Sequence, residues 1–285
     1  KGLASTLTFF KGAMDKFSIT ADIFYCGQYK SATEPFRMNK MSDQNRAQIA
    51  AMQNDYWSQM TNAIAEFTKA DSTTIYNWAN NYTIENANLA LANKVVTGIK
   101  YKDEVEAILL GLTNKNESQK VPFITVNSYA SSSKFLKSNS NIAILVAEGN
   151  IIDGTSNADT PEIASEDFIK EIRKIKDNDA IKAVVIRVNS GGGSALASEN
   201  ILRELNALRK KKPYVVSMGD YAASGGYYIA SAADSIYAMP TTITGSIGVF
   251  GMLFSATGLL EDKVGVTFDT EKNAAYADFP NMTRA

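Results

Sequence analysis

Residues 183–218 read AVVIRVNSGGGSALASENILRELNALRKKKPYVVSM. The first six, 183–188, are mostly apolar and β-branched, which is typical of a buried strand. A glycine-rich turn at 189–194 comes next, followed by an amphipathic helical pattern at 195–210 and a second apolar run at 214–218. This order of strand, turn, helix and strand indicates an α/β layer with a largely parallel sheet.

The same alternation continues on both sides of this stretch. Before it come an apolar run at 142–146 and a helical pattern at about 165–176. After it we expect a helix that begins behind Ser224 and a short strand at 235–239. The sequence therefore predicts an α/β domain over residues 141–285.

The first half of the chain has a different pattern. Residues 46–118 have helical periodicity, and residues 128–140 are a polar, serine-rich stretch of the kind found in linkers. We therefore predict a helical connector and linker over 46–140, preceded by a separate segment at 1–45.

An internal repeat relates the two ends of the chain. Residues 15–22 read DKFSITAD and align without gaps on residues 262–269, which read DKVGVTFD. The pairs Gly2-Leu3 and Gly251-Met252 match after a further shift of two residues. We infer a duplicated domain whose first copy is truncated, so that 1–45 is its C-terminal part and 141–285 the second copy.

The same alignment places Tyr29 on Tyr276 and Lys30 on Ala277. The two copies therefore differ at this position, because only the first copy has a basic side chain there.

The chain has 285 residues and no histidine. This composition excludes a Ser-His-Asp triad, a Cys-His pair and a histidine-based metal site, and leaves acid-base work to Lys, Asp, Glu or Tyr. The charges are nearly balanced, with 29 basic and 30 acidic residues, and offer no electrostatic reason to expect a nucleic-acid partner. Cys26 is the one cysteine, so an internal disulfide is excluded. We find no metal or cofactor motif and no apolar run long enough to span a membrane.

A serine flanked by small residues follows one of the predicted strands. The segment 219–228 reads GDYAASGGYY and opens a helix directly after Ser224. Small neighbours let a substrate backbone approach, and a helix N-terminus offers free amides to an oxyanion. The alternative is a helix start whose residues are small only because they pack against the sheet.

A second loop, 189–194, lies between a strand and a helix and reads NSGGGS. It lacks the Lys-Ser/Thr ending of a phosphate-binding loop and the spacing of a dinucleotide site. An oxyanion hole fits better, with one amide from this loop and one from Gly225.

Without histidine, Ser224 needs another base. A lysine serves when an apolar setting lowers its pKa towards neutrality. Lys30 lies among aromatic and small residues in YCGQYKSA, 25–32. The alternative for any single lysine is a solvated surface charge.

Four motifs in order resemble signal peptide peptidase A, also called protease IV, in its long duplicated form within peptidase family S49. They are GQYKSATEPF at 27–36, RVNSGGGS at 187–194, MGDYAASGGY at 218–227 and TGSIG at 244–248. The resemblance implies a Clp protease/crotonase-like fold, a repeated ββα superhelix with a largely parallel sheet, plus the helical connector. One departure is Gly191, where the family commonly has proline.

The resemblance also implies the roles of five residues. Ser224 is the expected nucleophile and Lys30 the expected general base, while the hydroxyl of Ser246 is expected to position the lysine amine. Gly192 and Gly225 are the expected oxyanion-hole amides.

For the whole protein the resemblance implies a serine endopeptidase that degrades remnant signal peptides and other short apolar peptides. It further implies a homotetramer on the outer, periplasmic side of the bacterial cytoplasmic membrane, held by an N-terminal anchor that is missing from this chain. Two alternatives remain open from the residues themselves. One is a crotonase-like acyl-CoA hydratase or isomerase, which would need a carboxylate at the site, and the other is a catalytically idle scaffold domain.

Overall fold

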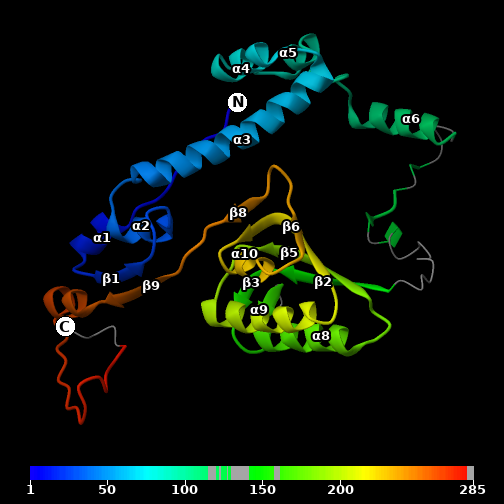
Figure 1. The fold of residues 1–285 in the computed structure, drawn as a ribbon. Coiled ribbons are helices and arrows are strands. Elements are labelled where there is room, and N and C mark those ends of the chain that lie inside the picture. The colour runs from blue at the N-terminus through cyan, green and yellow to red at the C-terminus, as the bar shows by residue number, and fades with distance from the viewer. Residues whose placement is uncertain (115–119, 122, 127, 130–140, 157–160, 281–285) are drawn as a thin grey trace. The chain divides into compact units, whose positions relative to one another are not determined.

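The computed structural model divides the chain into two compact units (Figure 1). The α/β unit comprises Ala4–Tyr56 and Asn141–Ala285, and the helical unit comprises Lys1–Leu3 and Trp57–Ser140. The structure describes residues 1–114, 120–121, 123–126, 128–129, 141–156 and 161–280. The predicted linker at 128–140 lies outside these ranges except for its first two residues, and the predicted boundaries at 45 and 140 stay predictions.

The α/β unit is built on a five-stranded sheet in which every pair of neighbouring strands is parallel. Its strands are β2 (Ile142–Glu148), β5 (Ala183–Ser190), β6 (Tyr214–Ala223), β7 (Ser235–Tyr237) and β8 (Ile243–Gly245). β5 lies between β2 and β6, and both β7 and β8 pair with β6. The prediction of an α/β domain with a parallel sheet is confirmed.

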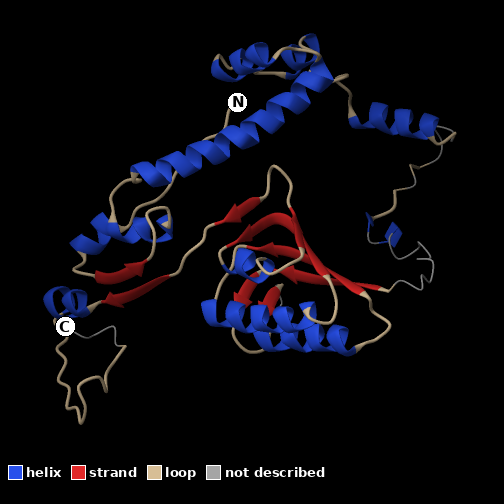
Figure 2. Ribbon diagram, in the orientation of Figure 1, coloured by secondary structure: helices blue, strands red, loops and turns tan. Residues whose placement is uncertain are grey.

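Two helices, α8 (Ser165–Asp177) and α9 (Ala195–Arg209), lie side by side along one face of this sheet (Figure 2). Alternate residues of β5 point into the interface, because successive side chains of a strand face opposite sides. α9 contributes residues spaced by three or four, as a helix with one apolar face does. The shared core includes Val184, Ile186, Val188, Ile201, Leu205 and Leu208. Each such side chain stabilises the unit by about 1.5–3 kcal/mol when fully buried.

The carboxyl ends of β5 and β6 lead into the two loops singled out in the sequence. β6 continues five residues beyond the predicted strand 214–218 and ends at Ala223, directly before Ser224. A short helix, α10 (Gly225–Ala230), starts behind that serine and packs against α9 and β6. Both loops therefore lie at the edge of the sheet where ligands bind in open α/β folds.

Two further small sheets were not predicted. β3 (Asn150–Ile152) and β4 (Glu162–Ala164) form a parallel pair, and β1 (Thr20–Tyr25) pairs antiparallel with β9 (Phe250–Ser255). The second pair joins segments from opposite ends of the chain, with Thr20 opposite Ser255 and Tyr25 opposite Phe250. Lys30 follows β1, and Ser246 precedes β9, so this pairing brings their two loops together.

Short helices complete the ends of the α/β unit. They are α1 (Lys11–Lys16), η1 (Ser31–Thr33), α2 (Glu34–Arg37) and η2 (Leu259–Val264). η1 and α2 follow the Lys30 loop directly, and η2 follows β9.

Helices also dominate residues 43–112, where the sequence predicts a helical connector. They are α3 (Asp43–Thr68), α4 (Ser72–Asn80), α5 (Ala87–Ala92) and α6 (Lys102–Leu112). The side chains of Asp71 and Asn86 cap α4 and α5 by accepting backbone N–H groups. Within the described ranges, no helix combines the length and apolarity needed to cross a bilayer.

Candidate active site

Ser224 occupies the sharp turn between β6 and α10. Its backbone has a φ of 52°, a left-handed conformation that is uncommon for a residue with a side chain. The Ser224 N–H donates to the carbonyl of Gly245 at 2.9 Å, which ties the turn to the end of β8. Backbone strain of this kind persists only where the surrounding structure holds it, and it is common at functional sites.

Lys30 reaches Ser224 from the loop between β1 and η1. Only 5% of Lys30 is exposed, so the alternative of a solvated surface lysine is wrong. Its Nζ lies 3.4 Å from Ser224 Oγ. Both residues belong to one chain and to the same compact unit.

Ser246 holds the lysine amine from the other side. Lys30 Nζ donates to the Ser246 carbonyl at 2.6 Å and contacts Ser246 Oγ at 3.1 Å. Ser246 also has a left-handed backbone, with a φ of 48°. Two serines in strained turns thus place three oxygen atoms around one amine.

Burial removes water from the Lys30 amine and lowers its pKa below the ordinary lysine value. The three atoms that contact the amine are serine oxygens, and none of them carries a negative charge that would raise the pKa again. The site therefore raises the fraction of neutral amine that is present at a given pH.

The glycine-rich loop after β5 lies directly against Ser224. A Cβ atom at Gly192 would lie 2.5 Å from the Gly225 nitrogen and 2.9 Å from Ser224 Cβ. Gly192 also has a φ of 100°, a conformation that side chains disfavour. Glycine is therefore required here for the loop to approach the serine.

The backbone N–H groups of this loop differ in whether they have a hydrogen-bond acceptor. Gly192 N–H donates to Ser190 Oγ at 3.1 Å, which occupies one of the two amides predicted for the oxyanion hole. Gly193 lies opposite Ile151 in a parallel bridge, whose two hydrogen bonds are made by the neighbouring residues Gly192 and Ser194. The N–H of Gly193 itself therefore points away from Ile151. Neither Gly193 N–H nor Gly225 N–H has an acceptor within the described ranges. Sequence reasoning did not separate Gly192 from Gly193. A serine two residues before Gly192 is nevertheless a signal that its hydroxyl accepts from the Gly192 N–H.

Sequence reasoning also missed Glu34, four residues after Lys30. Its side chain is fully buried and accepts hydrogen bonds from Asn45 Nδ2 at 2.7 Å and from the N–H and hydroxyl of Ser42. Burial alone would raise the pKa of this carboxyl, but these bonds and the Arg37 charge outweigh it and lower the pKa. Glu34 thereby fastens the segment behind Lys30 to the start of α3.

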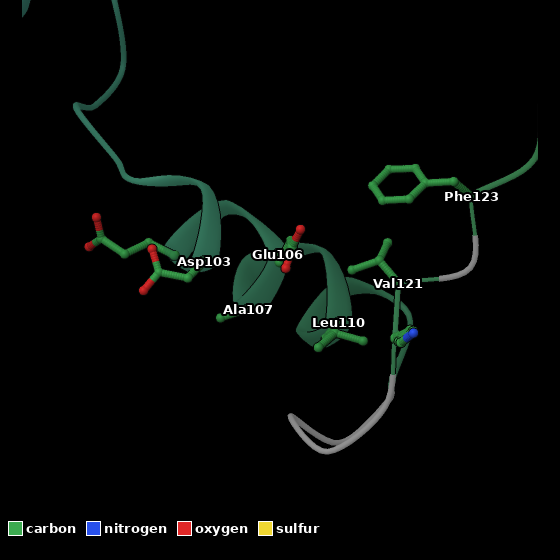
Figure 3. Close-up of a pocket in the computed structure, with 8 residues that line it drawn as sticks. Asp103, Glu106, Ala107, Leu110, Val121 and Phe123 are labelled. Carbon is green, nitrogen blue, oxygen red and sulfur yellow. The ribbon is translucent and has the colours of Figure 1, made fainter.

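Other parts of the described structure offer no competing centre. No group of three or more His, Cys, Asp or Glu side chains in the described ranges is arranged to hold a metal ion. Figure 3 shows a hollow in the helical unit, where carboxylates of α6 lie on one side and Val121 and Phe123 on the other. None of the five predicted site residues lines it.

Known proteases are similar to this chain over most of its length. Protease 4 of Haemophilus influenzae is 36% identical over 280 residues, which are 94% of this chain and 45% of that protein. The chloroplastic serine protease SPPA of Arabidopsis thaliana is 31% identical over 97% of this chain and 42% of that protein. The chain therefore spans less than half the length of these relatives.

Among solved structures, a lysine-to-alanine mutant of the 1510-N membrane-bound stomatin-specific protease in complex with a substrate peptide matches with a TM-score of 0.28 and 23% identity. The match covers 36% of this chain and 42% of that one. The family model described as peptidase family S49 matches residues 1–114 and 206–285, which include Lys30, Ser224 and Ser246. The chain belongs to peptidase family S49.

Proposed function

We propose that this chain carries the catalytic centre of a serine endopeptidase in which Ser224 is the nucleophile and Lys30 the general base. The observation that carries the proposal is the buried Lys30 amine 3.4 Å from Ser224 Oγ. A nucleophile and a base within reach of one another, with a third group orienting the base, is the arrangement that activates a serine. Ser246 is that third group.

In the proposed reaction, neutral Lys30 takes the Ser224 proton as Oγ bonds to the scissile carbonyl carbon. The resulting lysine ammonium then gives this proton to the leaving amine, and the C–N bond breaks. Water next attacks the acyl-enzyme, again with Lys30 as base, and Ser224 is released with its proton. The lowered pKa of Lys30 supplies the neutral form that the first step requires.

The oxyanion is stabilised by two backbone amides. Gly225 N–H lies next to the nucleophile at the start of α10, as predicted. For the second amide the sequence favoured Gly192, but its bond to Ser190 Oγ favours Gly193 in the same loop. A side chain at Gly193 would overlap the backbone of Ile151, so this close approach requires glycine.

The proposed substrates are remnant signal peptides and other short apolar peptides. A relative from Enterococcus faecium, 36% identical over 67% of this chain, is named a putative signal peptide peptidase. Ile247 and Val249 follow Ser246 in the chain and are 74% and 63% exposed, which suits apolar peptide side chains. A homotetramer at the outer face of the bacterial cytoplasmic membrane, anchored by a segment before this chain, remains part of the proposal.

The test is hydrolysis of a quenched fluorescent apolar peptide by the full-length protein. Ser224→Ala should lower kcat by on the order of a thousandfold or more, because the covalent step is lost. Ser231→Ala, a matched change at an exposed serine just behind α10, should leave the rate within about twofold. Full activity of Ser224→Ala, or folded wild-type protein without activity on any apolar peptide, would overturn the proposal.

A further inference from the structure

The loop after β5 contains three consecutive glycines, Gly191, Gly192 and Gly193. Glycine has the most backbone freedom of any residue, so such a run does not by itself fix where its amides point. The proposed oxyanion hole nevertheless needs one of these amides in one orientation, because a donor stabilises the oxyanion only at hydrogen-bond distance. Contacts with other segments must therefore fix the loop.

The side chain of Ser190 joins the backbone of this loop to a neighbouring turn. Its hydroxyl accepts from Gly192 N–H at 3.1 Å and donates to the Gly149 carbonyl at 2.7 Å, and only 1% of the residue is exposed. Gly149 N–H in turn donates to the Asn189 carbonyl at 3.1 Å. One buried hydroxyl thus ties the glycine loop to the turn between β2 and β3.

The other side of Gly192 is held by β3. The Gly192 carbonyl accepts from Ile151 N–H at 3.0 Å. In a planar trans peptide the C=O and the following N–H point in opposite directions, so this bond turns Gly193 N–H away from Ile151. Rotation about φ of Gly192 would move that peptide, and the bond from Gly192 N–H to the Ser190 hydroxyl limits this rotation.

Ser190 also lies where the two segments that supply the oxyanion amides meet. A Cβ at Gly226, in the first turn of α10, would overlap the Ser190 carbonyl oxygen. A Cβ at Gly192 would lie 2.5 Å from the Gly225 nitrogen. A shift of the glycine loop would therefore change the distance between the amides of Gly193 and Gly225.

We propose that Ser190 is a positioning residue for the oxyanion hole, whose hydroxyl fixes Gly192 and so keeps Gly193 N–H aimed at the substrate carbonyl oxygen. This inference rests on the proposed function, because it assigns a role within the same site. Ser190 acts through the loop, since the bonds of its hydroxyl involve neither Ser224 nor Lys30.

Ser190→Ala in the full-length protein removes both bonds of the hydroxyl and tests this role. With the loop amide misplaced, kcat for a quenched fluorescent apolar peptide should fall about 10- to 100-fold, while KM changes by less than about threefold. A matching peptide aldehyde forms a hemiacetal with Ser224 that places an oxygen in the hole. Its affinity should therefore fall by about the same factor as kcat/KM.

The pH dependence separates this role from general-base catalysis. The lysine amine must be neutral to act as base, so kcat/KM falls as pH drops below the pKa of Lys30. The Lys30 amine contacts Ser224 and Ser246 and has no bond to Ser190. In Ser190→Ala the profile should therefore become lower without moving along the pH axis.

Ser198→Ala is the matched control. Ser198 is equally buried, but its hydroxyl donates to the Ser194 carbonyl, which also accepts from Ser198 N–H. This variant should keep kcat within about twofold. Ser190→Cys, which has a similar volume and a weaker hydrogen-bonding atom, should show the pattern of Ser190→Ala with a smaller loss. It replaces Ser190→Ala in these assays if thermal unfolding shows that the alanine variant is not folded.

Equal losses of kcat in the Ser190 and Ser198 variants would overturn the proposal, because they would reflect the loss of any buried hydroxyl. So would a wild-type kcat without the Ser190 hydroxyl, a loss confined to KM, or an unchanged affinity for the aldehyde. Labelling of wild-type Ser224 by a fluorophosphonate does not depend on these results, so failure here leaves the proposed dyad intact.

Discussion

At the scale of single residues, the site depends on a lysine that is kept out of water. Burial removes water from the amine of Lys30, and this desolvation lowers its pKa below the ordinary lysine value. The same shift links protonation to folding. Between the lowered folded pKa and the unfolded value of about 10.4, the unfolded chain binds more protons, and the free energy of unfolding rises with pH.

Lys30→Met should remove this dependence while keeping most of the side-chain volume. As pH rises from 7 towards 10, wild type should gain stability relative to the variant, by at most about 1.4 kcal/mol per pH unit. Urea unfolding of both proteins at several pH values measures the difference. A difference that is constant with pH would contradict the lowered pKa.

Glu34→Gln should destabilise the protein by about 2 kcal/mol at pH 7, because an amide donor would then face the donors of Ser42 and Asn45. The cost should shrink as pH falls below about 4, since the folded pKa of Glu34 is lowered and its stabilisation is lost through that pKa. Glu66→Gln, at an exposed position of α3, is the control and should change stability little. Equal effects of the two changes would refute the role given to Glu34.

At the scale of elements, the nucleophile turn depends on how closely α10 approaches β5. A Cβ at Gly226 would overlap the carbonyl of Ser190 at the end of β5, whereas a Cβ at Gly111 in α6 would meet no atom within 4 Å. The two glycines therefore form a natural pair for comparison.

Gly226→Ala should cost about 1–3 kcal/mol through overpacking and should lower peptidase activity by displacing Ser224. Gly111→Ala should instead stabilise its helix by about 0.5–1 kcal/mol. Thermal unfolding and peptide hydrolysis together measure both effects. An active, equally stable Gly226→Ala variant would mean that α10 and β5 are further apart than described.

At the scale of the whole molecule, both residues of the proposed dyad belong to one chain. Lys30 and Ser224 lie in the same compact unit, although they come from opposite ends of the sequence. The pairing of β1 with β9 brings their loops together. An assembly of several chains should therefore hold as many independent sites as chains.

Mixing Lys30→Ala with Ser224→Ala chains tests this independence. Each mutant chain lacks one half of its own dyad, so co-expressed mixed assemblies should stay as inactive as either variant alone. Recovery of about a quarter or more of the wild-type activity would show that lysine and serine come from neighbouring chains.

The sequence predicts much of the α/β unit because its core strands are continuous apolar runs. It misses the far half of β6, where Gly219 and Asp220 interrupt the apolar pattern. β1 and β9 were also missed, because a pairing between distant segments leaves no local signal.

For the site residues, too, contacts between distant segments leave no local signal in the sequence. Ser224 stands out by its small neighbours, but composition alone treats Lys30 as one cation among many, and its proposed role follows from the family motif. Its burial depends on contacts with Ser246, more than two hundred residues away. The choice between Gly192 and Gly193 depends on whether the Ser190 hydroxyl accepts from Gly192 N–H, and the folded loop shows that it does.

The central claim is that Lys30 activates Ser224, and labelling of the full-length protein by a fluorophosphonate tests it most directly. Intact and peptide mass spectra should show one adduct per wild-type chain, located on Ser224. Ser224→Ala should show none, and Lys30→Ala should react at least about a hundredfold more slowly. Labelling that persists at the wild-type rate without Lys30, or an adduct on another serine, would contradict the account.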